Sequence, residues 1–250
     1  MTLRNIPKLV AVAASFTAIT ALPVLKATAE TIVVYGASGG VGSIIVDEAL
    51  MRGHDVVGVS RNPAGLTNDH PSFSAVAGDI TDVDSIIDVV AGADAVVISV
   101  NGVGPDNTPE SAVTSQAAKA YIEAAGRLGD AAPHVIQVGG GTTLYTDGVW
   151  GLDDPELVPG TRRHGQYFGH WQAIEAYRAS ENLEWTVMSG SRGALQSGER
   201  TGQYRVGGEE TLFNAEGSSF ISTEDFAIAV IDEAETGQSA GQRVAVGPPY

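Results

Sequence analysis

The chain has 250 residues, of which 43% are hydrophobic and 18% charged, so it can bury a sizeable core and is not disordered. Its formal net charge of −16 argues against nucleic-acid binding, because phosphates would be repelled rather than neutralised. The absence of Cys excludes disulfides, thiol nucleophiles and Cys-ligated metal sites.

The first 29 residues have the layout of a secretory signal peptide. Arg4 and Lys8 precede an apolar stretch, and Ala-Thr-Ala at 27–29 supplies the small residues that cleavage before Glu30 requires. The apolar stretch also contains Ser and Thr, which makes it weaker than a membrane span of about 20 well-apolar residues. A retained anchor and a misassigned start codon are the alternatives.

Cleavage would leave a signal peptide, 1–29, and a mature chain, 30–250. The signal peptide takes away three basic residues and no acidic one, so 11 Lys and Arg remain against 30 Asp and Glu, a net charge of −19. We expect the mature chain to form a single domain without a membrane span. It would be exported, periplasmic or secreted, if the signal peptide is used, and cytoplasmic otherwise.

From residue 31 onward, short apolar runs alternate with helical patterns, which is typical of βαβ units and a parallel sheet. The apolar runs are continuous, as in strands that helices cover on both faces. The sequence predicts strands over 31–36, 55–60, 73–78, 93–100, 134–139, 183–189 and 243–247. It predicts helices over 40–53, 82–92, 108–129, 165–180 and 224–235, with Thr81 and Thr223 as N-caps of the second and the last.

Two segments lack this regularity. Residues 140–163 are rich in Gly, Asp and Pro and are predicted to be a loop, and the Gly/Ser/Thr-rich residues 190–222 are a candidate lid or substrate lobe. The predicted fold class is therefore α/β: a Rossmann-like, doubly wound parallel sheet with helices on both faces and a small C-terminal substrate lobe.

A glycine-rich turn joins the first predicted strand to the first predicted helix. Gly36, Gly39 and Gly42 form G-x-x-G-x-x-G, in which the first glycine permits a tight turn and the second allows a pyrophosphate to approach the backbone. The third lets helix and strand pack closely, and the helix N-terminus favours phosphate charge. The residues predicted to bind a dinucleotide here are Gly36, Ala37, Ser38, Gly39, Gly40, Val41 and Gly42.

The end of the second strand indicates which dinucleotide is bound. An acidic residue there would bind the ribose 2′-hydroxyl of NAD, but the sequence is Ser60-Arg61-Asn62. Arg61 can pair with a 2′-phosphate, so Arg61 and Asn62 favour NADP(H) over NAD(H). Because ligands bind at the carboxyl ends of strands, we expect further cofactor contacts after the third, fourth and fifth strands. The expected contacts are Asp79 and Ile80 at the adenine, and Ser99, Val100, Asn101 and Gly139 along the rest of the cofactor.

Several stretches together resemble a known family. The chain is similar to the atypical short-chain dehydrogenases in six stretches: YGASGGVG, SRNP, AGDITD, LEWTVM, GERTGQYRVGGEE and ISTEDFAIAVIDEAE. Within these, the resemblance is closest to the NAD(P)H-binding group that includes candidate NADH-flavin reductases and biliverdin-IXβ/flavin reductase. It extends over about 30–250 and implies a Rossmann fold, NADPH as hydride donor and a flavin or similar flat acceptor as substrate.

One pattern of the wider superfamily is missing. The only lysines are Lys8, Lys26 and Lys119, and none follows a Tyr by four residues, so the Tyr-x-x-x-Lys acid pair is absent. Hydride transfer to a flavin needs less acid–base chemistry from the protein. The resemblance implies a hydroxyl residue near the nicotinamide, for which Thr142 is the best match. Near the next helix, Tyr167 and His170, with His164 as a further possibility, are the predicted proton donors.

Two other functions stay open: a non-catalytic protein that senses NADP(H), and an epimerase-like enzyme on the same fold. The His spacing predicts no metal site, and no nucleophile elbow of the α/β-hydrolase type occurs. We expect a small-molecule partner, and the sequence does not indicate an oligomeric state. An exported protein would also meet little free NADPH, and no Arg-Arg pair for export in the folded state precedes the apolar stretch.

Overall fold

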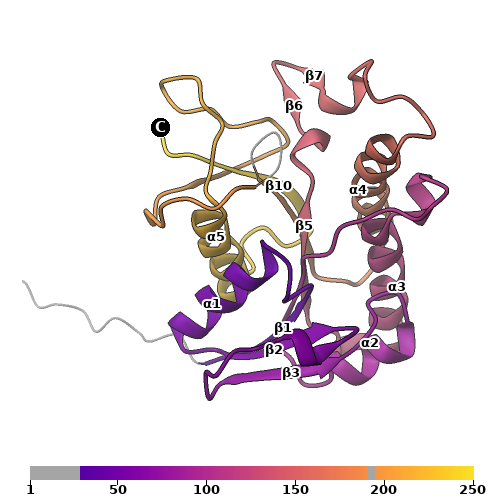
Figure 1. Cartoon of the computed structure of the whole chain (residues 1–250), viewed down its shortest axis with the longest axis vertical. Helices are drawn as coiled ribbons and strands as arrows, with labels where there is room; N and C mark the ends of the chain where they lie inside the picture. Colours follow the sequence, from indigo (N-terminus) through magenta and orange to yellow (C-terminus); the bar gives the residue numbers. More distant parts are fainter. Residues whose placement is uncertain (1–28, 191–194) are drawn as a thin grey trace, which may run out of the picture.

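The computed structural model describes residues 29–190 and 195–250. The predicted signal peptide therefore lies outside the described residues except for Ala29. A central sheet carries α1 and α5 on one face and α2, α3 and α4 on the other (Figure 1). None of the helices in the described ranges is long and apolar enough to cross a membrane.

The main sheet has the strand order β3-β2-β1-β4-β5-β8-β10-β9. Its strand pairs are parallel except for β9, which runs antiparallel to β10 at one edge. The chain moves outward from β1 to β3 and then returns to β4 on the other side of β1, so the strand order reverses between β1 and β4. A crevice for ligands is expected at that reversal. The strands are β1 (Thr31–Tyr35), β2 (Asp55–Ser60), β3 (Phe73–Ala77), β4 (Ala95–Ile98), β5 (His134–Gly139), β8 (Trp185–Ser189), β9 (Arg205–Gly207) and β10 (Gln242–Gly247).

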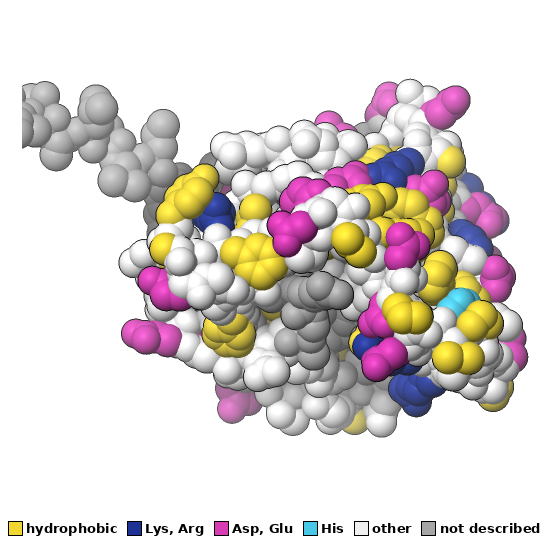
Figure 2. All heavy atoms as spheres, turned by 90° about the horizontal axis from the view of Figure 1, so that it is seen from above, with side chains coloured by type: hydrophobic (Ala, Val, Ile, Leu, Met, Phe, Trp, Pro, Cys, Tyr) yellow, Lys and Arg dark blue, Asp and Glu magenta, His cyan; other side chains and the backbone are white. Residues whose placement is uncertain are grey.

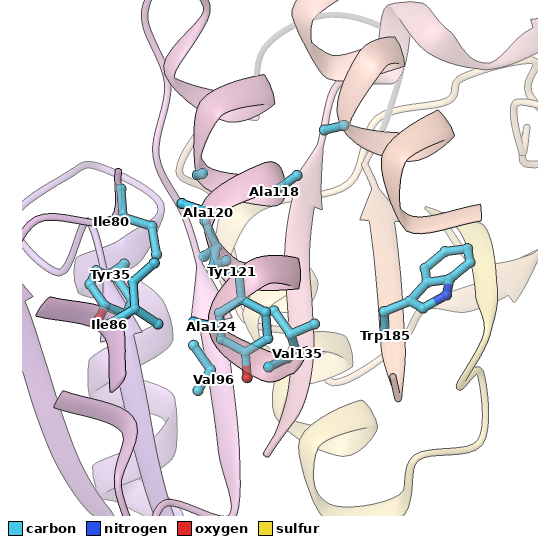
Figure 3. Packing of buried hydrophobic residues seen from close by; sticks show 14 of the residues in the cluster. Tyr35, Ile80, Ile86, Val96, Ala118, Ala120, Tyr121, Ala124, Val135 and Trp185 are labelled. Atoms are coloured by element: carbon cyan, nitrogen blue, oxygen red, sulfur yellow. The ribbon is translucent and has the colours of Figure 1, made fainter. Parts of the chain in front are cut away.

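Two apolar clusters hold the helices against the two faces of the sheet. One packs α1 and α5 against side chains such as Ile32 and Val34, and the other packs α2, α3 and α4 against Val33 and Val96. Figure 3 shows the second cluster, with the Tyr121 ring between Val96 and Val135. The helices are α1 (Gly42–Arg52), α2 (Val83–Val90), α3 (Val113–Leu128), α4 (Arg162–Arg178) and α5 (Thr223–Thr236).

The predicted α/β class, a doubly wound and largely parallel sheet, is confirmed, but two predicted N-caps are wrong by one residue. Asp82 caps α2, because its carboxylate accepts hydrogen bonds from the backbone N–H groups of Asp84 and Ser85. Thr81 instead donates its hydroxyl to Asp79. Ser222, not Thr223, caps α5 by accepting from the Asp225 N–H.

The helix predicted over 108–129 is interrupted. A 3-10 turn, η2 (Pro109–Ser111), is followed by Ala112 in an extended conformation, and α3 begins only at Val113. Backbone hydrogen bonds from Gly104 to Ser111 and from Val113 to Gly102 tie this break to the loop after β4. The local pattern favoured a continuous helix, and these contacts from outside the segment override it.

The predicted loop over 140–163 contains regular structure, and helix α4 begins at Arg162 rather than 165. The Thr161 hydroxyl accepts from the His164 N–H and so caps α4 earlier than predicted. A two-stranded hairpin, β6–β7, lies above the end of β5 (Figure 1). The remaining short elements are η1 (Pro63–Gly65), η3 (Gly129–Ala131), η4 (Gly141–Thr143), β6 (Tyr145–Thr146), β7 (Val149–Trp150) and η5 (Gly151–Asp153).

Candidate functional site

The turn between β1 and α1 requires glycine at two positions. Gly36 has φ +80°, and a Cβ there would lie 2.2 Å from the Ser99 carbonyl oxygen on the neighbouring chain segment after β4. A Cβ on Gly42 would lie 2.1 Å from the Gly36 carbonyl oxygen. Both contacts are far shorter than van der Waals distances, so the close approach of β1, α1 and the end of β4 depends on these two glycines.

The same turn leaves the start of α1 open. Gly39 and Gly40 are exposed, and a Cβ on Gly40 would meet no atom of the described residues within 4 Å. No side chain caps the α1 N-terminus, unlike that of α2, α4 or α5. Unpaired N–H groups and the helix dipole favour an anion at such a position, so this turn fits the diphosphate of a dinucleotide.

Two cavities meet at this turn. The first, here called the β3-side cavity, has a volume of about 390 Å³ and lies beyond the ends of β1, β2, β3 and β4. Arg61 lines it and is exposed, whereas Ile80 is buried. Hydrogen bonds from the Thr81 backbone and hydroxyl hold the pKa of Asp79 below its usual range, with a smaller contribution from Arg61. Asp79 is therefore an anionic acceptor at neutral pH.

The second, here called the α4-side cavity, has a volume of about 420 Å³. It shares Gly39, Ser99, Val100 and Asn101 with the first cavity, so the two form one continuous crevice across the strand reversal. Much of its wall is glycine backbone from the segment after β5. Side chains from α4 complete it: Gln166, Tyr167 and His170.

The described part of the α4-side cavity wall is uncharged. Among the described residues that line it there is no Lys, Arg, Asp or Glu. His170 is only 8% exposed, its ring lies against Gly140, and its buried Nδ1 has no hydrogen-bond partner in the part of the chain that the structure describes. Burial lowers the pKa of His170 to about 4, so the imidazole is neutral at pH 7. It can therefore offer or accept a hydrogen bond there but carries no positive charge.

An aromatic cluster and a surface of mixed charge surround the start of α4. Figure 2 views the molecule from above and shows acidic, basic and apolar side chains interspersed on this face. An aromatic cluster supports α4 from this side: Trp150 packs edge-on against Trp171 at 4.8 Å and against Phe168 at 6.2 Å. It holds the hairpin against the helix that carries Tyr167 and His170.

Most of the predicted site residues come together in this crevice. The β3-side cavity contains Gly36, Ser38, Gly39, Arg61, Asp79, Ile80, Ser99, Val100 and Asn101. The α4-side cavity contains Gly39, Gly40, Val41, Ser99, Val100, Asn101, Gly139, Thr142, Tyr167 and His170. Three predicted residues line neither: Ala37 is buried in the core, Gly42 is buried in the first turn of α1, and Asn62 is exposed beyond Arg61. His164, the further possibility, also lines neither and stacks on Phe168.

Sequence reasoning missed several lining residues. Val113 and Gln116 reach the β3-side cavity from α3, and Gln166, Gly190 and Leu195 line the α4-side cavity. Gln166 precedes Tyr167 and could have been found from that proximity. The α3 residues carry no such signal, because only the break at Ala112 brings the start of α3 to the strand ends.

The family follows from a match over most of the chain. A family model described as NAD(P)H-binding matches residues 36–236, which begin at the first glycine of the turn and end with α5. The chain belongs to the NAD(P)H-binding family. The uncharacterized protein YwnB of Bacillus subtilis is 27% identical to this NAD(P)H-binding chain over 227 residues, 85% of this chain and 96% of YwnB.

Solved structures of similar proteins share the whole fold. A candidate exported protein from Burkholderia pseudomallei is 32% identical with a TM-score of 0.71, and covers 87% of this chain and 99% of its own. A candidate NADH-flavin reductase from Streptococcus pneumoniae is 27% identical with a TM-score of 0.70, covering 88% and 99%. A candidate epimerase from Bacteroides thetaiotaomicron is also 27% identical, with a TM-score of 0.74, covering 89% and 99%. These relatives support a nicotinamide cofactor for this family member.

Proposed function

We propose that this NAD(P)H-binding protein is an oxidoreductase that passes hydride from NADPH to a flavin or a similar flat acceptor. The observation that carries the proposal is the crevice itself, in which a cavity suited to the nucleotide continues past the glycine turn into a second cavity whose described lining residues are uncharged. The likeness to a candidate NADH-flavin reductase supports the acceptor class.

Different residues of the crevice would bind different parts of the cofactor. The backbone of Gly39 and Gly40 at the α1 N-terminus would hold the diphosphate. Ile80 offers an apolar surface to the adenine, with the Asp79 carboxylate beside it. Arg61 would take the 2′-phosphate, since its guanidinium can form two parallel hydrogen bonds to phosphate oxygens. The nicotinamide would then lie in the α4-side cavity.

The chemistry of the wall favours an acceptor that spreads charge over its own rings. NADPH, when bound, supplies a hydride, and the acceptor becomes electron-rich. Among the described residues, the wall of the α4-side cavity offers the hydroxyls of Thr142 and Tyr167 and the neutral imidazole of His170, and no Lys or Arg that would stabilise a localised alkoxide. An isoalloxazine or quinone ring needs only hydrogen bonds of this kind, which these three side chains can donate.

Turnover separates this proposal from its alternatives. Purified protein is mixed with NADPH and, in turn, riboflavin, FMN and a soluble quinone, and the loss of NADPH absorbance is followed. Oxidation of NADPH with at least one acceptor supports the reductase. Tight NADPH binding without oxidation by any of them would instead favour a sensor of NADP(H), and redox-neutral conversion of a sugar nucleotide would favour an epimerase, as the Bacteroides relative is named.

Cofactor preference gives a residue-level prediction. Arg61→Ala removes the guanidinium at the end of β2, so we expect the affinity for NADPH to fall by about tenfold to a hundredfold, while NADH affinity changes little. Isothermal titration with each nucleotide measures both. Arg127→Ala removes an exposed arginine of α3 that pairs with Glu123 and Asp84, away from both cavities, and serves as the control. An equal loss for NADPH and NADH in Arg61→Ala would contradict the assignment.

We also propose that the chain is exported with cleavage before Glu30. The Burkholderia relative, a candidate exported protein, supports export. The first strand begins at Thr31, directly after the predicted cleavage position, so cleavage would leave the whole sheet intact. N-terminal sequencing of protein from the native host tests this: Glu30 as the first residue supports it, and an intact N-terminus refutes it.

A further inference from the structure

A run of three glycines, Gly139 to Gly141, forms part of the α4-side cavity wall, and glycine backbone does not hold one conformation by itself. The conformation must be fixed by contacts from elsewhere. Gly139 ends β5 and pairs with Ser189 of β8, and Thr143 holds the peptide that follows: its N–H and its hydroxyl both donate to the Gly140 carbonyl oxygen, at 3.0 Å and 2.7 Å.

Thr143 is itself held by an unusual partner. Nη2 of Arg243 donates to the Thr143 hydroxyl oxygen at 2.8 Å, and the Arg243 side chain is fully buried. Burial lowers the pKa of Arg243 to about 10, so the guanidinium stays charged at neutral pH. A hydroxyl that accepts from a buried cation is a stronger donor, which strengthens its bond to Gly140.

The buried cation is only partly compensated. Nη1 of Arg243 lies 3.4 Å from a carboxylate oxygen of Glu209, which also pairs with Arg178 of α4. Neither Nη1 nor Nε has a hydrogen-bond partner among the described residues. A buried charge with incomplete partners costs stability. The hydrogen bond from Arg243 to Thr143 connects the guanidinium to the cavity wall. We infer that Arg243 is buried there to hold the wall in place rather than to stabilise the fold.

We propose that Arg243 is a positioning residue for the reaction: through the Thr143 hydroxyl it fixes the Gly140 peptide and, with it, the Gly139–Thr142 wall of the α4-side cavity. This rests on the proposed function, because the wall is assigned to the nicotinamide and the acceptor. The indole of Trp150 donates to the Thr143 carbonyl oxygen at 3.1 Å and anchors the same residue from the hairpin β6–β7.

Thr143→Val tests the relay, because valine keeps the shape and lacks the hydroxyl. We expect kcat with NADPH to fall about tenfold while the affinity for 2′,5′-ADP, which occupies only the nucleotide half, is unchanged. Thr143→Ser keeps the hydroxyl and should restore kcat. Thr146→Val is the matched control, since it removes a hydroxyl pair with Thr211 in the same hairpin without a link to Gly140.

Three outcomes decide the matter. A fall in kcat confined to Thr143→Val and rescued by serine supports the relay. Wild-type kcat in Thr143→Val overturns it, and so does an equal loss of NADPH and 2′,5′-ADP affinity, which would show a general structural role.

If the wild-type protein turns over no acceptor, the proposed reaction fails, and the relay is then judged by binding alone. Thr143→Val should weaken NADPH affinity several-fold relative to 2′,5′-ADP affinity, and an unchanged ratio of the two affinities refutes the relay. If Thr143→Val does not fold, Arg243→Lys is measured in the same way.

Discussion

Gly36 and Gly40 belong to one turn, yet a methyl group would meet opposite surroundings at the two positions. At Gly36 it would lie 2.2 Å from a backbone oxygen in a left-handed conformation, and at Gly40 it would meet nothing within 4 Å. Gly36 is therefore required by the fold, whereas no contact with the described residues requires glycine at position 40. Its lack of a side chain matters only to a ligand that approaches the start of α1.

Alanine at these two positions should separate folding from binding. Gly36→Ala should lower the free energy of unfolding by about 3 kcal/mol, because it combines a clash with left-handed strain. Gly40→Ala should leave that free energy within about 0.5 kcal/mol and weaken NADPH at least about tenfold. Urea unfolding and titration calorimetry measure the two effects, and wild-type NADPH affinity in Gly40→Ala would argue against a diphosphate at this turn.

His170 makes the protein sensitive to acid. Its pKa is about 4 in the folded chain against an ordinary 6.5, so the unfolded chain binds the proton first as the pH falls. The stability that His170 contributes is complete above about pH 6.5 and is lost progressively toward pH 4. Between pH 7 and pH 5 this amounts to about 2 kcal/mol.

His170→Gln should therefore reduce the loss of unfolding free energy between pH 7 and pH 5. Urea unfolding at both pH values measures it, and His70→Gln, at an exposed histidine of the loop before β3, is the control. His134 is also buried, has a lowered pKa and adds a loss of the same sign, so some acid sensitivity should persist in His170→Gln. An identical pH dependence in wild type and His170→Gln would contradict a buried neutral imidazole.

At the scale of elements, α4 approaches its neighbours through two glycines on one face. A Cβ on Gly165 would lie 2.3 Å from the Asn107 carbonyl oxygen, and a Cβ on Gly169 would lie 2.1 Å from the Ala112 Cβ. The helix thus sits against the interrupted segment before α3, and this close packing brings Tyr167 and His170 to the crevice. The spacing of four residues keeps both glycines on the same side.

Gly169→Ala should destabilise the protein by about 1–3 kcal/mol, because the added methyl overpacks the contact with Ala112. It should also lower turnover, since α4 must move away from the crevice. Gly126→Ala, in α3, is the matched control: nothing lies within 4 Å, and a helical alanine should stabilise by about 0.5–1 kcal/mol. Thermal unfolding and kcat report the two effects, and equal stability of the two variants would contradict the packing argument.

The elements were predictable where local pattern dominates and not where tertiary contacts decide. Continuous apolar runs gave the parallel strands and their helices, and adjacent polar residues misled only the choice of cap, since Asp82 and Thr81 are both good caps. The break at Ala112 and the edge strand β9 have no local signal. Backbone hydrogen bonds to Gly102 and Gly104 hold the break, and pairing with β10 forms the edge strand.

At the scale of the whole molecule, a charged network joins α1, α5 and the segment before β9. Glu48 is 3% exposed and accepts hydrogen bonds from Arg52 and, through both oxygens, from Arg200. Arg52 also pairs with Asp232 and Glu235 of α5. Burial would raise the pKa of Glu48, but the two guanidinium groups outweigh it and hold the pKa below its usual range.

Glu48→Gln should lower the free energy of unfolding at pH 7 by about 2 kcal/mol, because two guanidinium groups lose their shared anion. A carboxyl with a lowered pKa stabilises above its unfolded pKa of 4.5 and loses that effect as the pH falls further. The difference from wild type should therefore shrink below pH 4.5. Asp47→Asn, at the exposed neighbour, is the control in urea unfolding, and a difference that persists unchanged at low pH would contradict the network.

The candidate site was predictable to the extent that strand ends and the glycine turn define it. Arg61, Asp79 and Asn101 follow strands and could be placed by the rule that parallel strands present ligands at their carboxyl ends. Arg243 and Thr143 could not, because they are 100 residues apart and meet only when β10 enters the sheet. The neutral state of His170 likewise depends on burial that no local pattern encodes.

Strand β10 pairs with β8 on one side and β9 on the other, and it carries Arg243. Until residues 242–247 are available, the sheet has a gap and the wall beside Gly140 lacks its distant anchor. A nascent polypeptide therefore gains the complete crevice only after residues 242–247 have been translated. If the protein crosses a membrane unfolded, it must assemble that crevice, and acquire its nucleotide, on the far side.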